Sequence, residues 1–372
     1  MSRSDRVARA QTEAKEREAP ILRVAASTRA VVALGLSLLL LVTAPGRLAA
    51  QQCTLCSLNA WSGNASDSSR RSPAAYRLLS DDSRDYAGAA FSLQGTDGPL
   101  RGVQPEAEVP RWEFLERHQL LFSTLIPVAG LVLVTANSLI GYDTDHGFQI
   151  HHEGWFGRHT TNGGADKASH LTDYYVLSQL YEDVYRMLGH SEKAAILWGW
   201  GLAIATGLGN EVSDGFTRHG FSYEDLVMDA VGATAGSLVS LTRTRDLVGM
   251  RVSHLPGSTY THDVYSADFK FSGLGQRLGV NFGPLRWLLV SVTYGSKGYR
   301  VKPPIQEQRQ IGLEIGLNLQ AILFDVGVSR STWWGYGLHL IGDNVRFPFT
   351  AVGMRYDLNH SRWHGPNTGN FD

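Results

Sequence analysis

The spacing of apolar residues divides the chain into a helical part followed by a part rich in strands. The first long apolar run extends from Gln119 to Ile140 and covers about 22 residues, enough for a membrane span. Pro127 and Asn137 suit a buried or interface-bound helix equally well. The run alone therefore leaves both interpretations open.

Three further helices are predicted after a loop rich in glycine and aromatic residues. They cover residues 166 to about 188, 192 to about 215 and 222 to about 241. Asp166 and Ser222 are expected to cap the N-termini of the first and third helices, and Asp225 follows Ser222 at the spacing of a capping box. Gly232 and Gly236 are four residues apart, a spacing that lets two helix backbones approach closely.

After about Arg251, apolar and polar residues alternate as they do in strands. Residues 264–271, 287–294, 311–317 and 345–356 are predicted strands, with another around Tyr336, Leu338 and Leu340. About four to six strands are too few for a closed membrane barrel, which needs about eight. A small antiparallel sheet packed beside the helices is the simpler interpretation, and an oligomeric barrel is the alternative.

The N-terminal region has the pattern of an export signal. Arg23 and Arg29 precede an apolar run over residues 31–43, and small residues follow as far as Ala50. This predicts a cleaved signal peptide over residues 1–50, with an uncleaved anchor as the alternative. Residues 51–111 are polar and predict a disordered spacer. Cys53 and Cys56 are expected to form a small loop or an intermolecular bridge, with lipid attachment at Cys53 as the alternative.

The charge of the chain argues against nucleic acid as a partner. The 372 residues include 34 basic and 35 acidic side chains, a formal net charge of −1. A nucleic-acid-binding protein normally carries a basic patch or stripe. The sequence also lacks zinc-finger spacing, a phosphate-binding glycine loop and a dinucleotide-binding motif.

Acidic and histidine side chains gather at the ends of three predicted helices. Asp166 and His170 are four residues apart, Glu211 and Asp214 three apart, and Asp225 and Asp229 four apart, so each pair shares one helix face. Short connections make successive helices antiparallel, which brings these ends together. The candidate site residues are Asp166, Lys167, His170, Glu211, Asp214, Asp225 and Asp229.

Three interpretations of this cluster remain open. In the catalytic one, His170 is a general base or metal ligand, Glu211 and Asp214 are ligands or acid–base partners, and Lys167 steadies an anion such as phosphate. A divalent metal would then be held by His170, Glu211 and Asp214. In the structural one, the side chains cap helices and form a buried network, with Lys167 neutralising Glu211 or Asp214. In the third, the cluster binds a metal, lipid head group or protein without turnover.

Other histidines and tryptophans give weaker signals. His146, His151, His152, His159 and His219 match no defined metal spacing and are expected to be ordinary loop residues. The pair Trp333–Trp334 fits either a membrane-interface belt or ordinary packing on the sheet.

Three segments resemble the YfiM-type predicted periplasmic lipoprotein family, which is similar to the wider VanZ-like group. They are GGADKASH (163–170), NEVSDGF (210–216) and GFSYEDLVMDAVGATAG (220–236). The segments NSLIGY (137–142) and HEGWF (152–156) resemble the lead-in of this family, so the resemblance covers residues 120–241. It implies a location in the periplasm but no assigned biochemical activity. Asp229 stands where relatives often carry Asn, and the lipoprotein cysteine signal is poor here.

Together these observations predict an α+β protein. Its expected parts are a signal peptide (1–50), a disordered spacer (51–111), a four-helix apolar bundle (112–245) and a small antiparallel β-sheet (246–372). We expect an exported, periplasm-facing, membrane-associated envelope protein, with membrane or lipid as a partner, whose cluster has a structural or binding role in envelope maintenance. The alternative is a membrane-associated hydrolase or transferase that acts on a lipid-like substrate through His170, Glu211 and Asp214.

Overall fold

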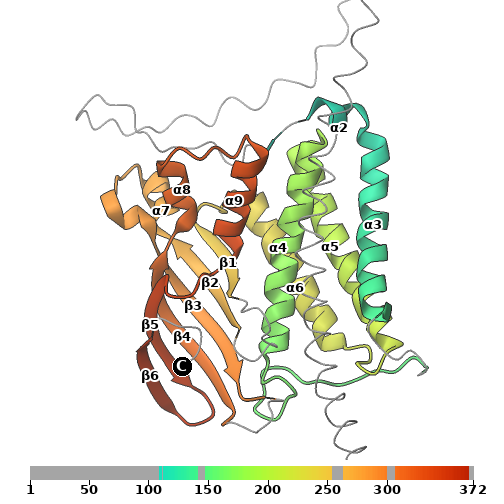
Figure 1. The fold of residues 1–372 in the computed structure, drawn as a ribbon, viewed down its shortest axis with the longest axis vertical. Coiled ribbons are helices and arrows are strands. Elements are labelled where there is room, and N and C mark those ends of the chain that lie inside the picture. The colour runs from blue at the N-terminus through green and yellow to red at the C-terminus, as the bar shows by residue number, and fades with distance from the viewer. Residues whose placement is uncertain (1–108, 111, 141–146, 254–262, 300–305, 368–372) are drawn as a thin grey trace, which may run out of the picture. The chain divides into compact units, whose positions relative to one another are not determined.

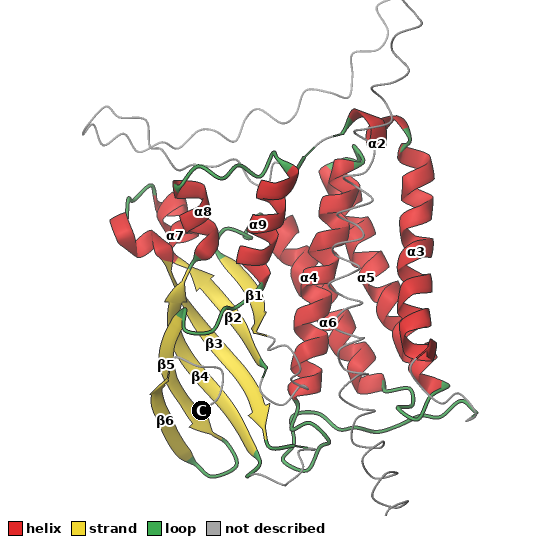
Figure 2. Cartoon of the chain, viewed as in Figure 1, coloured by secondary structure: helices red, strands yellow, loops and turns green. Residues whose placement is uncertain are grey.

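The computed structural model describes residues 109–110, 112–140, 147–253, 263–299 and 306–367. The predicted signal peptide, nearly all of the predicted spacer, the two cysteines and His146 lie outside these residues. Within them, helices come first and a single antiparallel sheet follows (Figures 1 and 2). The α+β prediction is therefore confirmed.

The helical part begins with the short α2 (Glu113–Arg117) and continues with four long helices. These are α3 (Gln119–Ile140), α4 (Ala165–Met187), α5 (Glu192–Gly215) and α6 (Tyr223–Leu241). Helices α4, α5 and α6 pack on one another, and α3 packs against α5 (Figure 1). Their bounds lie close to the predicted ones because the apolar runs and the residues that end them are clear in the sequence.

Glycines let α4 approach its neighbours closely. A Cβ added at Gly232 of α6 would lie 2.2 Å from the Leu171 carbonyl oxygen, and one at Gly199 of α5 would lie 2.4 Å from the Ser178 carbonyl oxygen. Any larger residue at either position would collide with the backbone of α4. The close approach predicted from the spacing of Gly232 and Gly236 is therefore confirmed.

Of the two predicted caps, one is confirmed and one is wrong. The Ser222 side chain accepts a hydrogen bond from the Asp225 backbone N–H at 3.2 Å and caps α6. Helix α4 instead begins after Gly164, whose φ of +84° is a left-handed conformation that suits glycine. Asp166 lies inside the first turn of α4, and its carboxylate binds Lys167 rather than capping the helix.

Six strands in chain order form the antiparallel sheet. They are β1 (Val248–Ser253), β2 (Val264–Lys270), β3 (Leu288–Lys297), β4 (Gln308–Leu317), β5 (Ala351–Asp357) and β6 (Arg362–Asn367). Short helical segments fall between the strands: α7 (Phe271–Leu278), η3 (Gly283–Trp287), α8 (Leu319–Asp325) and α9 (Trp333–Asn344). Four of these strands fall within or close to predicted ones, whereas β1 and β6 were not predicted.

The predicted strand around Tyr336, Leu338 and Leu340 is wrong, because these residues belong to α9. The Thr332 side chain caps this helix by accepting from the Gly335 backbone N–H. The buried residues of α9 are Gly335, Tyr336, His339 and Gly342, which recur at intervals of three or four residues or adjoin one another. The apparent alternation came from reading every second residue of this helical pattern.

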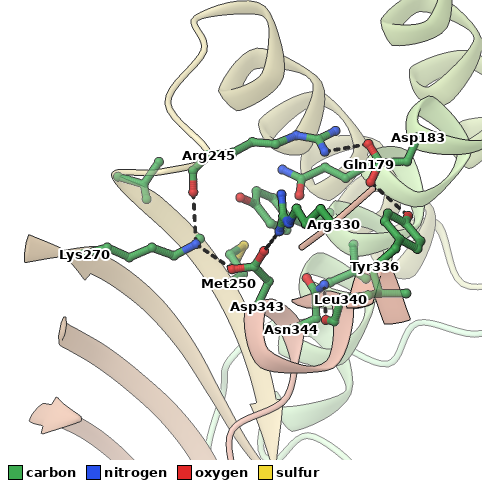
Figure 3. Close-up of a pocket in the computed structure, with 14 residues that line it drawn as sticks. Gln179, Asp183, Arg245, Met250, Lys270, Arg330, Tyr336, Leu340, Asp343 and Asn344 are labelled. Carbon is green, nitrogen blue, oxygen red and sulfur yellow. Dashed lines mark hydrogen bonds and ion pairs between the residues drawn. The ribbon is translucent and has the colours of Figure 1, made fainter. Parts of the chain in front are cut away.

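Ion pairs connect the helical part to the sheet (Figure 3). Arg245, after α6, donates to Asp183 of α4 at 2.8 Å, and the Tyr336 hydroxyl of α9 donates to the same carboxylate at 3.0 Å. Lys270 of β2 lies 3.0 Å from Asp343 of α9 and also donates to the Arg245 carbonyl oxygen. These contacts fix the sheet against α4 and α9.

Candidate functional site

The start of α4, the end of α5 and the start of α6 meet at one end of the helical part. His170 Nδ1 of α4 lies 2.7 Å from Asp229 Oδ1 of α6. The Ser222 backbone N–H at the start of α6 donates to Glu211 Oε2 of α5 at 3.0 Å. The antiparallel arrangement thus brings together side chains that are far apart in the sequence, such as His170 and Asp229, which are separated by 59 positions.

Lys167 is the buried cation of this cluster, with 1% of its surface exposed. Its ammonium group donates to Asp225 at 2.5 Å, to Glu153 at 2.8 Å and to Asp166 at 2.9 Å. An ammonium has three protons to donate, so these carboxylates satisfy it. Lys167 therefore does not neutralise Glu211 or Asp214 as predicted, and it has no donor left for an anion such as phosphate.

Glu153 is a member of the cluster that was not predicted. It lies in the loop before α4 and reaches Lys167 across 14 positions of sequence. Its place in the segment HEGWF was the available signal, since that segment also resembles the lead-in of the family. The spacing of residues in that segment does not predict a contact between Glu153 and Lys167.

His170 is held between two carboxylates of α6. Besides Asp229 on its Nδ1 side, Asp225 Oδ1 lies 3.7 Å from its Nε2 atom. Burial alone would lower the pKa of His170, but the hydrogen bond and charge of Asp229, with the charges of Asp225 and Asp166, raise it well above its ordinary value. These neighbours favour the protonated form of the imidazole, which is a second cation of the cluster.

Burial also raises the pKa values of two acids of the cluster. For Glu211 it raises the pKa to about 8, with the charge of His170 opposing the rise and the carboxylates of Asp225 and Asp214 adding to it. Burial likewise raises the pKa of Asp229 to about 6, although the hydrogen bond from His170 opposes this shift. Glu211 is thus mostly protonated at neutral pH, which reduces the negative charge that the site must bury.

Asp214 lies at the margin of the cluster. It is half-buried, and the Asn210 amide lies 3.4 Å from its Oδ2 atom. Its expected place as a metal ligand beside His170 and Glu211 is taken by Asp229. The exchange follows from the helices: Asp214 is in the last turn of α5, whereas Asp229 is one turn inside α6 and faces His170 directly.

Within the part of the chain that the structure describes, two sets of side chains have the geometry to hold a metal ion. Asp166, His170 and Asp225 form one, and His170, Glu211 and Asp229 form the other, with ligand atoms of each set within 4.8 Å of one another. The Lys167 ammonium contacts both carboxylates of the first set, so a cation is already present there. The second set has no such internal cation apart from the proton of His170.

The loop histidines line a separate hollow. His151, His152 and His219 border it together with Glu153, and its volume is about 550 Å³. None of these histidines belongs to either metal-holding set found in the described residues. The hollow adjoins the cluster through Glu153, which is the residue that connects it to Lys167.

Comparison with known proteins connects this region to one family. The model of the predicted periplasmic lipoprotein family DUF2279 matches residues 152–241, which include Glu153 and all of the predicted site residues. The match confirms the prediction of an exported, envelope-associated protein, and the YfiM-type and VanZ-like groupings stay predictions. No match was found among curated proteins or among solved structures.

Proposed function

We propose that this chain is a membrane-associated envelope protein whose cluster binds a divalent transition-metal cation and so joins α4, α5 and α6. The ligands would be His170, Glu211 and Asp229, one from each of the three helices. This is a binding role with a structural consequence, because a metal shared by three helices holds them together. It replaces Asp214 by Asp229 in the ligand set expected from the sequence.

The observation that carries this proposal is an oxygen atom of Asp229. Asp229 is fully buried, and no hydrogen-bond partner among the described residues reaches its Oδ2 atom. A buried carboxylate oxygen without a partner is costly. A cation beside His170 and Glu211 would satisfy it. Imidazole and carboxylate together suit Zn²⁺ and related ions, whereas Mg²⁺ and Ca²⁺ prefer sites made of oxygen atoms.

The charge balance of the cluster supports the same proposal. Five carboxylates, those of Glu153, Asp166, Glu211, Asp225 and Asp229, surround one ammonium and one imidazole in the described residues. Burying unbalanced charge costs several kcal/mol, so protons or a metal must supply the missing positive charge. Metal binding would release the protons of His170 and Glu211, which makes it more favourable as pH rises.

A thermal-shift experiment on the full chain in detergent tests this function. At about pH 8, Zn²⁺ at roughly a hundred times its Kd should raise the Tm by roughly 5–10 °C, and a chelator should reverse the change. His170→Ala and Asp229→Asn should abolish the shift. Asp214→Asn is the matched control, because Asp214 is a neighbouring acid outside both sets, and it should keep the shift. A shift that survives Asp229→Asn would overturn the proposal.

The hollow beside Glu153 favours a second candidate function. In it, the chain is a hydrolase or transferase for a lipid-like envelope substrate, with His170, Glu211 and Asp214 as the reacting groups. The hollow would admit a polar head group, and Glu153 would connect it to the cluster. This candidate requires Asp214→Asn to abolish an envelope phenotype while leaving the Tm unchanged. The metal-binding proposal requires the same variant to keep that phenotype.

A further inference from the structure

The outer face of the sheet is apolar and exposed. We define it by six outward side chains of its central strands: Val292, Ile311, Leu313, Ile315, Val352 and Met354. Between 43% and 60% of the surface of each is exposed. All other outward positions from 288 to 294, 311 to 317 and 352 to 356 hold Leu, Val or Tyr. No charged side chain interrupts this stretch of the outer face.

The opposite face of the sheet buries charge. Arg251 of β1 donates to Asp268 of β2 at 2.5 Å, and Glu314 of β4 accepts from Arg355 and from Arg346, each at 2.7 Å. All five side chains are at most 4% exposed. The polarity of the sheet is therefore inverted, with charges inside and large apolar side chains outside.

Inverted polarity identifies the surroundings of the outer face. A sheet in water places its apolar face on the core and its polar face toward solvent. A sheet that faces lipid does the reverse, because the acyl chains accept apolar side chains and polar groups turn inward. We infer that the outer face lies against the acyl chains of a lipid bilayer. This inference concerns the sheet and does not depend on metal binding by the helical cluster.

The helices favour lipid over a protein partner as the occupant. Residues Gln119–Ala136 of α3 are long and apolar enough to cross a membrane, and only 6% of this window is buried. Large apolar side chains such as Leu197 of α5 and Val231 of α6 are also exposed. One protein partner would cover one patch. Exposed apolar surface on the sheet and on three helices fits a lipid environment better.

Strand β6 marks one border of this surface. Pro366 stands in this strand, as proline does in edge strands, and Arg362 and His364 turn to the inner face, where they contact Asp357. Its outward aromatic residue, Trp363, is 63% exposed beside Tyr356 of β5. Tryptophan is enriched where a membrane meets water. The outer face therefore ends at β6, which lies at the level of the head groups.

Photo-crosslinking of the full chain tests this inference. Leu313 is replaced by p-benzoylphenylalanine, and the purified protein is placed in vesicles of phosphatidylethanolamine and phosphatidylglycerol and irradiated. Mass spectrometry should find phospholipid adducts at position 313, at least about tenfold more than at the control position Gln306, which is exposed just before the start of β4. The same label at Val352 repeats the test on a neighbouring strand, and an unchanged Tm shows that each variant folds.

Two results would overturn the inference. Adducts between two protein chains at positions 313 and 352 would show that protein covers the outer face. Lipid adducts no more abundant than at Gln306 would show that the face meets water. Neither result would affect the Zn²⁺-dependent Tm shift, so failure here is distinguishable from failure of the metal-binding proposal.

Discussion

Among the buried sets of charges in the described residues, the one on the sheet and the one in the helical cluster differ in their ratio of acids to cations. On the inner face of the sheet, each of Asp268 and Glu314 contacts at least one arginine. In the helical cluster, carboxylates outnumber cationic side chains, and Glu211 and Asp229 have raised pKa values. In the sheet set every carboxylate meets at least one permanent cation, whereas the acidic set needs protons or a metal.

This difference in charge distinguishes the sheet set, a structural network, from the helical cluster, a candidate binding site. Arginine stays protonated at any ordinary pH, so the cations of the sheet network are permanent. Carboxylates and imidazole can exchange protons near neutral pH, so the helical cluster can adjust its charge. Both sets are buried and both connect distant parts of the chain. Only the helical cluster is expected to respond to pH and to metal ions.

The largest effect is expected in the sheet. Glu314→Gln leaves Arg346 and Arg355 buried without the carboxylate that both contact, and should lower the free energy of unfolding by about 3–5 kcal/mol. The loss should be the same from about pH 5 to about pH 8. Denaturant unfolding at several pH values measures the loss of free energy of unfolding and its dependence on pH. Glu113→Gln is the control, because its ion pair with Arg117 is exposed and contributes little.

Removal of the cation of the helical cluster should have a smaller and pH-dependent effect. Lys167→Met leaves the carboxylates of Asp166 and Asp225 buried without the ammonium, at a cost of about 3 kcal/mol at pH 8. At pH 5 Glu211 and Asp229, whose pKa values are raised to about 8 and about 6, hold protons, so less negative charge surrounds the site and the cost should fall. Unfolding curves at both pH values test this. A cost independent of pH would remove the distinction between the two sets.

Glu211 should account for part of the pH dependence of stability. Its pKa is raised from 4.5 to about 8 in the folded state, so the folded state loses stability as pH rises through this range. With a chelator present, Glu211→Gln should be more stable than wild type by about 2 kcal/mol at pH 8 and similar at pH 5. Denaturant unfolding against pH measures this difference.

In the Glu211→Gln variant, the free energy of unfolding should still fall as pH rises, but less steeply than in wild type. The raised pKa of His170 stabilises the folded state fully below pH 6.5, and this contribution is lost as pH rises through the folded-state value. If the free energy of unfolding of this variant falls with pH as steeply as that of wild type, Glu211 is ionised throughout this pH range.

The smallest effect is expected at a glycine behind Asp229. A Cβ at Gly207 would lie 2.6 Å from Asp229 Oδ2, so Gly207→Ala should displace this carboxylate and cost about 1–2 kcal/mol. Gly201→Ala in the same helix is the matched control, since its Cβ would meet no side chain of the described residues within 4 Å. It should be neutral or stabilising by up to about 1 kcal/mol. Thermal unfolding compares the two.

Much of the helical part could be predicted from the sequence. The apolar runs of α3 and α5 and the Ser222 cap of α6 fix those helices locally. Antiparallel packing through short connections then implied that His170, Glu211 and Asp229 would meet. Which side chains of the cluster form ion pairs with one another could not be predicted, because this depends on where the side chains point. Lys167 for this reason binds Asp225 and Glu153 rather than Glu211 or Asp214.

The sheet shows a different limit of sequence reasoning. The alternation of Ile311 and Leu313 with Gly312 and Glu314 predicts a strand, but it does not say which face is buried. Here the charged face is inside, where its carboxylates are paired with arginines from the neighbouring strands and from the segment after α9. Helix α9 was missed for a related reason, since its glycines made a helical pattern look like an alternating one.

Elemental analysis of the full chain, purified without chelators, tests the metal-binding proposal most directly. We expect about one divalent transition-metal ion per wild-type chain, the same content in Asp214→Asn, and none in His170→Ala or Asp229→Asn. A wild-type chain that carries no metal, and that gains none on incubation with Zn²⁺ at about pH 8, would contradict the proposal. The helical cluster would then be a network completed by protons alone.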